Sequence, residues 1–396
     1  MTDRPRAEVA VTDVLAAGPT VAEFAEQARA FLDEHAEHRP DGFPDAMFAQ
    51  FREMDDVEAW EQSCRQWQRT LFEHGFAGIT WPAEVGGRGL SPAHALAWTD
   101  LEFEYDVPRG LFGVTLEMIG PTVYTFGTAA QKEHCRRILR GEEVWCQLMS
   151  EPGAGSDLAA VSTSARRTED GWVVNGQKVW TSEARHSRYG YLIARSEPGS
   201  ERHRGLTAFV VDLEAPGVEV RPLRQMTGGA SFAEVFFDDV LLPAEAVLGE
   251  VGQGWMVAMT TLGFERFTMF GRSFGRLVRQ AADLDWDASD ARERFVDVVV
   301  QQRGLAAFEE GMHARLLAGS APGPEAALAK LATGRLVSGL GDAVRRSLGA
   351  ELALDDPSLD DWRLVLLAGP AFHIAGGTDE IVKSMIAERV LGLPKG

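Results

Sequence analysis

The stretch WCQLMSEPGAGSDLAA (residues 145–160) marks the point at which the chain changes from helical to strand-like patterning. Before it, from Thr20 to about residue 143, apolar residues recur three and four positions apart, as on one face of a helix. After it come short apolar runs separated by Gly, Pro and charged residues, which is typical of strands. Helical spacing returns near Gly254. The sequence therefore predicts an α+β multidomain fold with an N-terminal helical domain, a middle antiparallel β-barrel or sandwich and a C-terminal helical bundle.

We expect the domain limits to fall where these patterns change. The segments are a flexible leader over residues 1–19, an N-terminal helical domain over 20–143, a β domain over 144–248 and a helical bundle over 249–396. Thr20 and Glu23 have the spacing of a capping box that begins the first helix. Ser91-Pro92 begins another, since proline suits the first helical position.

Five stretches in the middle segment are strand candidates. One is VVNGQKVW (173–180), in which Asn-Gly between two apolar runs predicts a hairpin turn, because both central residues of a type I′ turn need positive φ. The others are YGYLIAR (189–195), LTAFVVDL (206–213), VEVRPL (218–223) and AEVFFDDVLLP (233–243).

Composition excludes several classes of function. The 396 residues carry a formal net charge of −20 and no Lys/Arg-rich run, which argues against a nucleic-acid surface. No apolar run reaches 18 residues, so we expect no membrane span. The three cysteines Cys64, Cys135 and Cys146 are too widely spaced for a disulfide framework or a metal site, and we expect no metal. A reducing cytoplasm is the expected location.

A glycine-rich turn lies within the first stretch. In SEPGAGSD (150–157), glycine permits close approach of the backbone, and successive amide N–H groups can bind an anion such as a phosphate. Such a turn by itself is equally typical of an ordinary surface loop. About thirty residues later, NGQKVWTS (175–182) places a large aromatic residue beside two hydroxyl residues at a strand end.

These two motifs together resemble those of the acyl-CoA dehydrogenase family. WPAEVGGRG (81–89), EVFFDDVLLPAEAVLG (234–249) and GGTDEIVKSMIAERVLGLPKG (376–396) extend the resemblance over nearly the whole chain, in family order. The resemblance implies an FAD-dependent enzyme of lipid metabolism. It also implies an acyl-CoA thioester as substrate and an electron acceptor such as an electron-transfer flavoprotein.

The resemblance assigns cofactor contacts position by position. Ser150 is expected to hydrogen-bond the flavin ring, and Gly155 and Ser156 to face the pyrophosphate, with Ser156 and Arg266 beside the acyl-CoA. The remaining contacts with FAD are expected at the flavin edge, against the isoalloxazine and at the last helix: Gln147, Leu148 and Met149; Trp180, Thr181 and Ser182; Thr378 and Glu380.

The family reaction removes a proton from Cα and transfers a hydride from Cβ to flavin N5. Because the α-proton is weakly acidic, a carboxylate base must act together with donors to the thioester oxygen. Many members keep the base directly before Gly-Thr, where this chain has Gly376. The backbone N–H of Gly376 can still be a donor, so only the carboxylate is missing from this position.

Other members take the base from a helix of the third domain, and Glu265 in LGFERF (262–267) matches that position. Its helical neighbours are mostly apolar, and no cation lies three or four residues away to form an exposed ion pair. Partial burial raises the pKa of a carboxyl group toward the range of a base at neutral pH. The alternative interpretation is a buried glutamate paired with an arginine of another helix.

Three functional interpretations stay open. RSFG (272–275) follows Glu265 by only seven residues, whereas the family has its RxxFG motif, which reaches the FAD of a neighbouring subunit, several turns further on. The chain is therefore a dehydrogenase using Glu265, a partner subunit of a heteromeric dehydrogenase, or an oxidase or monooxygenase on the same fold. A homo- or hetero-oligomer, dimer or tetramer, is expected in each case.

Overall fold

The computed structural model describes residues 18–39, 48, 51–52, 54, 56–108, 110–265, 272–286, 289–318 and 323–394. Within these residues the order of elements is helical, then β, then helical, as the sequence predicts. The expected leader lies outside the described residues except for Gly18 and Pro19. No described helix combines the length and the apolar character needed to cross a membrane.

The N-terminal part is built from short helices around a mixed aromatic and aliphatic core. They are α1 (Val21–His35), α3 (Val57–Glu73), α4 (Pro92–Glu102), a π-helical turn (Thr115–Ile119), α5 (Gly120–Phe126) and α6 (Ala129–Leu139), with a small pair of strands β1 (Glu37–His38) and β2 (Tyr105–Asp106). The capping box predicted at Thr20 is present, since Thr20 and Glu23 cap each other's backbone N–H.

The middle part is an eight-stranded sheet within the described residues. Its strands are β3 (Trp145–Leu148), β4 (Ser164–Arg167), β5 (Gly171–Ser182), β6 (Tyr189–Arg195), β7 (Leu206–Asp212), β8 (Val218–Leu223), β9 (Phe232–Pro243) and β10 (Val247–Leu248). The order is β10-β7-β6-β4-β5-β9-β8, mostly antiparallel, and β3 joins the sheet by a parallel pairing with β6.

The predicted hairpin at Asn175-Gly176 is wrong. Strand β5 runs straight through this dipeptide and pairs with β9, with a register shift between Val174 and Gly176. Gly176 has φ 150°, and a Cβ there would lie 2.5 Å from the Thr163 hydroxyl oxygen, so the glycine permits close packing within a bulge. The β4–β5 hairpin turns five residues earlier, where Thr168 N–H donates to Gly171 O.

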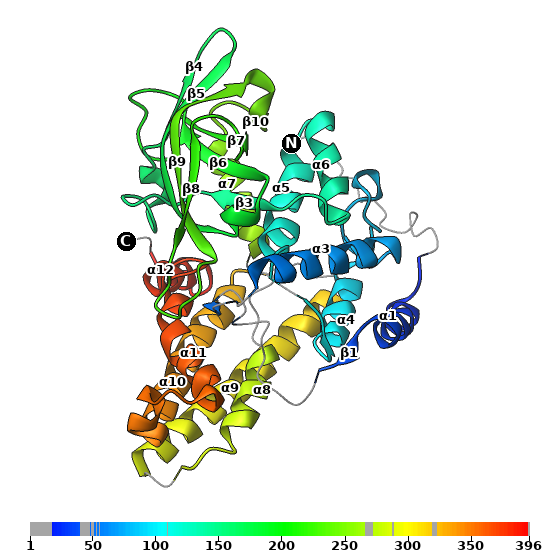
Figure 1. The fold of residues 1–396 in the computed structure, drawn as a ribbon, viewed down its shortest axis with the longest axis vertical. Coiled ribbons are helices and arrows are strands. Elements are labelled where there is room, and N and C mark those ends of the chain that lie inside the picture. The colour runs from blue at the N-terminus through cyan, green and yellow to red at the C-terminus, as the bar shows by residue number, and fades with distance from the viewer. Residues whose placement is uncertain are drawn as a thin grey trace, which may run out of the picture.

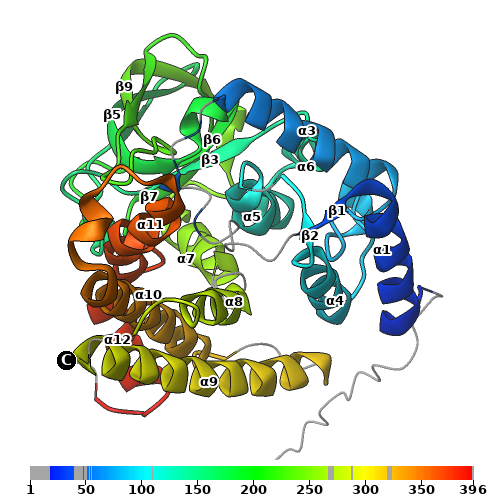
Figure 2. The same cartoon turned by 60° about the horizontal axis from the view of Figure 1, so that its bottom comes forward.

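The C-terminal part is a helical bundle, with one helix placed apart from it. Its helices are α7 (Gly254–Glu265), α8 (Arg272–Ala281), α9 (Ser289–Leu317), α10 (Ala326–Leu348), α11 (Asp360–Ala368) and α12 (Asp379–Arg389). Figures 1 and 2 show the sheet at one end of the molecule and α8, α9 and α10 at the other, and α12 packs against α10. Helix α7 packs against β7, β6 and α5 instead of the bundle.

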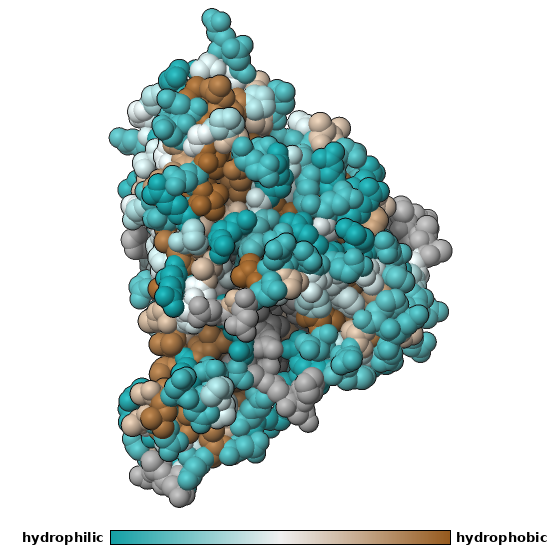
Figure 3. Space-filling model, viewed as in Figure 1, coloured by the Kyte–Doolittle hydropathy of each residue, from teal (hydrophilic) through white to brown (hydrophobic). Residues whose placement is uncertain are grey.

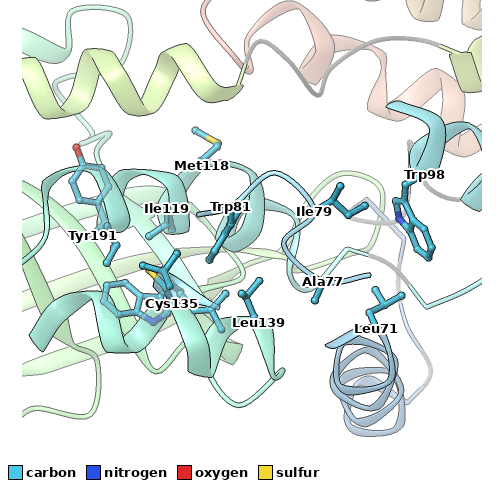
Figure 4. Close-up of a cluster of buried hydrophobic side chains, with 14 of the residues drawn as sticks. Leu71, Ala77, Ile79, Trp81, Trp98, Met118, Ile119, Cys135, Leu139 and Tyr191 are labelled. Carbon is cyan, nitrogen blue, oxygen red and sulfur yellow. The ribbon is translucent and has the colours of Figure 1, made fainter. Parts of the chain in front are cut away.

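One core is shared by the N-terminal helices, part of the sheet and α7. This cluster joins residues of the N-terminal helices with Tyr191 of β6, Ala208 of β7 and Val257 of α7. Figure 4 shows part of it, with the Tyr191 hydroxyl directed toward the helix above, α7. The bundle and the sheet have separate cores of their own. Because the shared core crosses the domain boundary, the first half of α7 is packed against the sheet through Val257 and Ala258.

Candidate active site

Two distant stretches of sequence meet at the junction of β3 and β5. Val179 N–H donates to Ser150 O over 2.9 Å, and Lys178 Nζ donates to Met149 O over 2.9 Å. These bonds bring the predicted residues 147–150 next to 180–182. Because β3 and β5 belong to one sheet, the two stretches form a fixed surface on which a ring can lie.

A buried ion pair fixes this junction. Lys178 Nζ lies 2.8 Å from Glu151 Oε1, and the two side chains are 0% and 4% exposed. Burial would raise the pKa of Glu151, but Lys178 and donors from Ser162 and Thr163 lower it to about 2. Burial lowers the pKa of Lys178 to about 8, against the opposing effect of Glu151. Both charges are satisfied, so the pair holds the glycine-rich turn to the strand.

Sequence reasoning did not find this pair. Its residues lie inside the two motifs that were identified, Glu151 in SEPGAGSD and Lys178 in NGQKVW. Each stretch contains a charged residue, but nothing in either sequence indicates that Glu151 and Lys178 are partners.

Trp180 combines a left-handed backbone conformation with an exposed side chain. Its φ is 60°, its side chain is 62% exposed, and it lies in a bulge where the pairing with β9 shifts between Lys178 and Thr181. A bulky residue at positive φ is strained, and an indole exposed to water loses apolar burial. Both costs are explained if a flat ligand stacks on the indole.

Two buried polar atoms next to Trp180 fit such a ligand. Within the described residues, Thr181 Oγ1 and Gln147 Oε1 have no hydrogen-bond partner, although buried polar atoms are nearly always paired. An isoalloxazine ring carries both acceptors and an N–H donor along its edge, so it can satisfy a hydroxyl and an amide oxygen together. The residues present therefore fit FAD, and the predicted contact residues 147–150 and 180–182 would hold its ring.

The glycine-rich turn faces the C-terminal helices. Glu151 and Ala154 close the turn by two backbone hydrogen bonds, and a Cβ at Gly155 would contact nothing within 4 Å. Ser156 Oγ lies 3.5 Å from Thr378 Oγ1, the residue that caps α12. The predicted pyrophosphate contact Ser156 thus lies beside Thr378, a predicted FAD contact of the last helix. Glu380, the other predicted contact there, is exposed in the first turn of α12.

The bend before α12 contains two consecutive glycines in left-handed conformations. Gly376 has φ 68° and Gly377 has φ 98°. In the part of the chain that the structure describes, the Gly376 N–H donates to no backbone carbonyl. The bend therefore presents a backbone donor beside Thr378, and it carries no carboxylate.

The predicted base lies at the last residue of α7. The helix ends at Glu265, whose side chain is outside the described part of the chain, as is the whole of Arg266. Thr261, one turn earlier, is buried: its hydroxyl lies 2.9 Å from that of Thr122 and beside the Tyr191 hydroxyl. Tyr191 pairs across the sheet with Gln147. Thr261 of α7 thus contacts the residue of β6 that pairs with Gln147 of β3.

A second buried carboxyl follows the ring-contact stretch directly. Glu183 has φ 57°, and burial raises its pKa to about 8, opposed by Arg185 and reinforced by Glu61. The polar residues on both sides of it in the sequence gave no sign that this carboxyl is buried. Among the described residues no three His, Cys, Asp or Glu side chains are grouped so that they could hold a metal ion.

Comparisons with known proteins give one consistent result. Residues 19–142, 146–240 and 252–391 match the N-terminal, middle and C-terminal domains described for acyl-CoA dehydrogenases. The acyl-CoA dehydrogenase IpdE1 of Mycobacterium tuberculosis is 40% identical over 349 residues, covering 85% of this chain and 90% of its own.

Two solved structures illustrate the likeness of fold. The ChsE4-ChsE5 complex from Mycobacterium tuberculosis has a chain with a TM-score of 0.75 and 25% identity, covering 96% of this chain and 100% of its own. A variant of the Tcur3481-Tcur3483 steroid ACAD gives a TM-score of 0.75 and 25% identity, covering 95% and 99%.

Proposed function

This chain belongs to the acyl-CoA dehydrogenase family, and we propose that it dehydrogenates an acyl-CoA thioester at Cα–Cβ with Glu265 as the base. It is an oxidoreductase that acts on acyl-CoA, and FAD is its cofactor. FAD supplies the acceptor for the hydride that leaves Cβ. What the chain itself must do is hold the thioester, stabilise its oxygen and remove the α-proton.

The position of the end of α7 is the observation that carries the base assignment. Thr261, four residues before Glu265, is buried between Thr122 and Tyr191, and Tyr191 pairs with Gln147 at the expected flavin edge. A residue one turn later on the same helix face lies near that edge too. Gly376, at the alternative position, has no side chain to act as a base.

The bend at Gly376 is suited to stabilising the thioester oxygen. Its N–H has no backbone acceptor within the described residues, and the N-terminus of α12 lies directly after it. A backbone N–H and a helix N-terminus both stabilise negative charge on an oxygen. As the α-proton leaves for Glu265, charge develops on the thioester oxygen, and the Gly376 N–H stabilises it.

We propose that residues of the β domain and of the C-terminal part together hold the cofactor and the substrate. Trp180 stacks on the isoalloxazine, while Ser150, Thr181 and Ser182 with Gln147, Leu148 and Met149 contact its edge. Gly155, Ser156, Thr378 and Glu380 contact the rest of FAD, and Ser156 with Arg266 contacts the acyl-CoA. The unpaired Thr181 and Gln147 oxygens and the 3.5 Å approach of Ser156 to Thr378 support this division.

The acyl group is proposed to be long, branched or bulky. A base on a helix approaches the substrate from another side than a base on the bend, which leaves a pocket of different shape. A similar structure is named a steroid ACAD, which favours a polycyclic acyl group. We also propose an electron-transfer flavoprotein as the electron acceptor. A cytoplasmic location is proposed because the three cysteines are buried free thiols.

The test is anaerobic bleaching of the bound flavin. Purified protein is mixed with butyryl-, isovaleryl-, octanoyl- and a steroid-carboxylic CoA thioester, and absorbance near the flavin maximum is followed. Glu265→Gln is expected to slow bleaching by roughly 10²–10⁴-fold, the usual effect of losing a general base. Glu293→Gln, an exposed carboxylate on α9, is the matched control and should bleach at the wild-type rate.

Two results would contradict the assignment. Bleaching of Glu265→Gln at the wild-type rate removes Glu265 as base, and a large loss in Glu380→Gln instead would transfer the role to α12. A wild-type flavin that no thioester bleaches, even with a partner chain present, removes the proposed reaction.

The second candidate is a subunit of a heteromeric dehydrogenase. It is favoured by the two similar structures, whose names pair two different chains, and by the early position of Arg272 to Gly275 in the sequence. Protein expressed alone would then be colourless and would gain flavin only when a relative of the same fold is expressed with it. Yellow protein from the single chain rejects this candidate.

A further inference from the structure

A cluster of four polar side chains lies behind the bend that carries Gly376. His373 Nε2 lies 2.9 Å from Ser338 Oγ, and its Nδ1 lies 2.9 Å from Asp379 Oδ2. Lys330 Nζ lies 3.6 Å from Asp379 Oδ1 and donates to His373 O over 3.4 Å. The side chains of Lys330 and Asp379 are 7% and 14% exposed, whereas that of His373 is 32% exposed.

The cluster joins both ends of the bend to one helix. His373 ends the 3-10 turn before the bend (Gly369–His373), and Asp379 is the first residue of α12 after it. Ser338 and Lys330 both belong to α10. The His373–Asp379 bond closes the chain across residues 374–378, and the two bonds to α10 fix that closed bend to the bundle.

Such a closure matters because the bend has two consecutive glycines. Glycine loses more conformational freedom on ordering than any other residue, so two consecutive glycines need external contacts to fix one conformation. Ile374 and Ala375 are exposed and contribute little packing. Ile374 and Ala375 N–H both donate to Ala371 O, at the start of the bend. Beyond them, the side-chain hydrogen bonds of His373 hold the bend, and apolar contacts of the bend itself contribute little.

The hydrogen bonds of Asp379 and Ser338 determine which ring nitrogen of His373 carries the proton. An ionised Asp379 can only accept, so Nδ1 of His373 carries the proton that it donates. In the neutral ring Nε2 then accepts from the Ser338 hydroxyl. His373 thus needs both of its nitrogen atoms, and no other side chain offers two such groups at this spacing.

The order Ser–His–Asp also occurs in hydrolases, but the packing argues against a nucleophilic serine here. Ser338 lies in the middle of α10, and a Cβ placed on Gly369 would lie 3.3 Å from its Oγ. The 3-10 turn therefore covers the hydroxyl and leaves no space for a thioester carbon to approach it.

We infer that His373 is a positioning residue for the proposed reaction: with Ser338 and Asp379 it holds the Gly376–Gly377 bend so that the Gly376 N–H stays directed at the thioester oxygen. The inference rests on the proposed function. It assigns no catalytic contact to His373 itself, which acts through the backbone of the bend.

Hydrogen exchange tests the bend without any substrate. The FAD-loaded protein, wild type and variants, is exchanged in D₂O, and the peptide covering residues 373–381 is followed by mass spectrometry. His373→Asn keeps a group near Nδ1, His373→Gln keeps one near Nε2, and His373→Leu keeps neither. We expect exchange in this peptide to accelerate about tenfold or more in His373→Leu and less in the two amides.

Flavin reduction tests the consequence. With the thioester that bleaches wild-type flavin fastest, His373→Leu and Ser338→Ala should reduce flavin roughly 10–100-fold more slowly, because a misplaced backbone donor loses most of its effect. Flavin content and thermal midpoint should stay near wild type. Thr333→Val is the matched control, because it removes a buried hydroxyl of α10 that bonds only Ala329 O.

The outcomes separate the inference from the proposed function. Unchanged exchange in both His373→Leu and Ser338→Ala overturns the inference, whatever the activity. Loss of flavin and of thermal stability in proportion to loss of rate also overturns it, since the cluster is then only structural. Release of free CoA by wild type that Ser338→Ala abolishes would show a hydrolase instead. A wild-type flavin that no thioester bleaches contradicts the proposed function alone and leaves the exchange result valid.

Discussion

Trp180 lowers the stability of the folded protein at the surface where the flavin ring is proposed to lie. An L residue at φ 60° is less stable than glycine there by about 1–2 kcal/mol, and the exposed indole gains little by burial. Trp180→Gly should therefore leave the thermal midpoint of the flavin-free protein unchanged or raise it by about 1–3 °C, while FAD affinity falls roughly tenfold or more through loss of stacking.

Calorimetry of the flavin-free protein and fluorescence titration with FAD measure these two effects. Leu241→Ala, which truncates another strongly exposed apolar residue of the sheet, should not change FAD affinity. Destabilisation of the flavin-free protein by Trp180→Gly would mean that the indole packs on the protein itself.

Glu183 gives a pH dependence with a defined sign. The unfolded carboxyl loses its proton near pH 4.5, but the buried one holds it until about pH 8. Between these values the folded state binds more protons than the unfolded state, so this group's contribution to stability is full below pH 4.5 and is lost as pH rises through 8. Glu183→Gln cannot ionise and should be more stable than wild type at pH 8, by about 1–3 kcal/mol.

Chemical unfolding at pH 5 and at pH 8 measures this difference. The two proteins should be closest at pH 5 and furthest apart at pH 8. Curves that stay parallel over this range would show that Glu183 ionises normally in the folded protein.

At the scale of elements, β5 depends on a single charge pair. Lys178 and Glu151 are both fully enclosed, and each satisfies the other across 2.8 Å. Lys178→Met leaves a buried carboxylate with only the donors of Ser162 and Thr163, which should cost about 2–4 kcal/mol of unfolding free energy and most of the bound flavin.

The double variant Lys178→Met, Glu151→Gln is the control for that prediction. Since it removes the unpaired charge, urea unfolding should show a recovery of stability of at least half the loss. Equal loss in both variants would mean that packing of the lysine stem, and not its charge, holds the turn to the strand.

The sequence predicts elements best where a local rule applies. The capping box at Thr20, the start of α4 at Pro92 and the strands β6 to β9 all follow from residues within a few positions. The hairpin failed because the rule for Asn-Gly assumes a turn, whereas Asn175 bonds Asp239 on the neighbouring strand and keeps β5 extended. A long-range partner decided the outcome, and no local pattern contains it.

At the scale of the whole molecule, the order of domains could be predicted but their contacts could not. The change of hydrophobic period along the chain predicts helix and sheet. The matches to acyl-CoA dehydrogenase domains and structures confirm the fold class predicted from it. That α7 leaves its bundle to pack on β7, and that His373 meets Ser338, depend on residues far apart in sequence. The domain limits and the role of Glu265 stay predictions.

Assembly is the last property that the single chain suggests. Apolar side chains reach the surface over the sheet and over the C-terminal helices in Figure 3. Around α12 they include Ile374 at 63% and Leu391 at 65% exposure, with Ile381 and Leu393 also exposed. Exposed apolar side chains that gather in one place are typical of a surface that contacts another subunit. We therefore expect native mass spectrometry to show a dimer or tetramer.

The substitution Leu391→Asp tests that expectation. It places a charge on the apolar surface around α12 and replaces no residue of the proposed active site. It should shift the native mass toward the monomer, lower flavin occupancy if a neighbouring subunit completes the FAD site, and leave the far-ultraviolet circular dichroism unchanged. Leu241→Asp, on the exposed face of β9, is the matched control and should keep the oligomer. If Leu391→Asp assembles as wild type does, or if the wild type is a monomer with full flavin, the residues around α12 form no subunit contact.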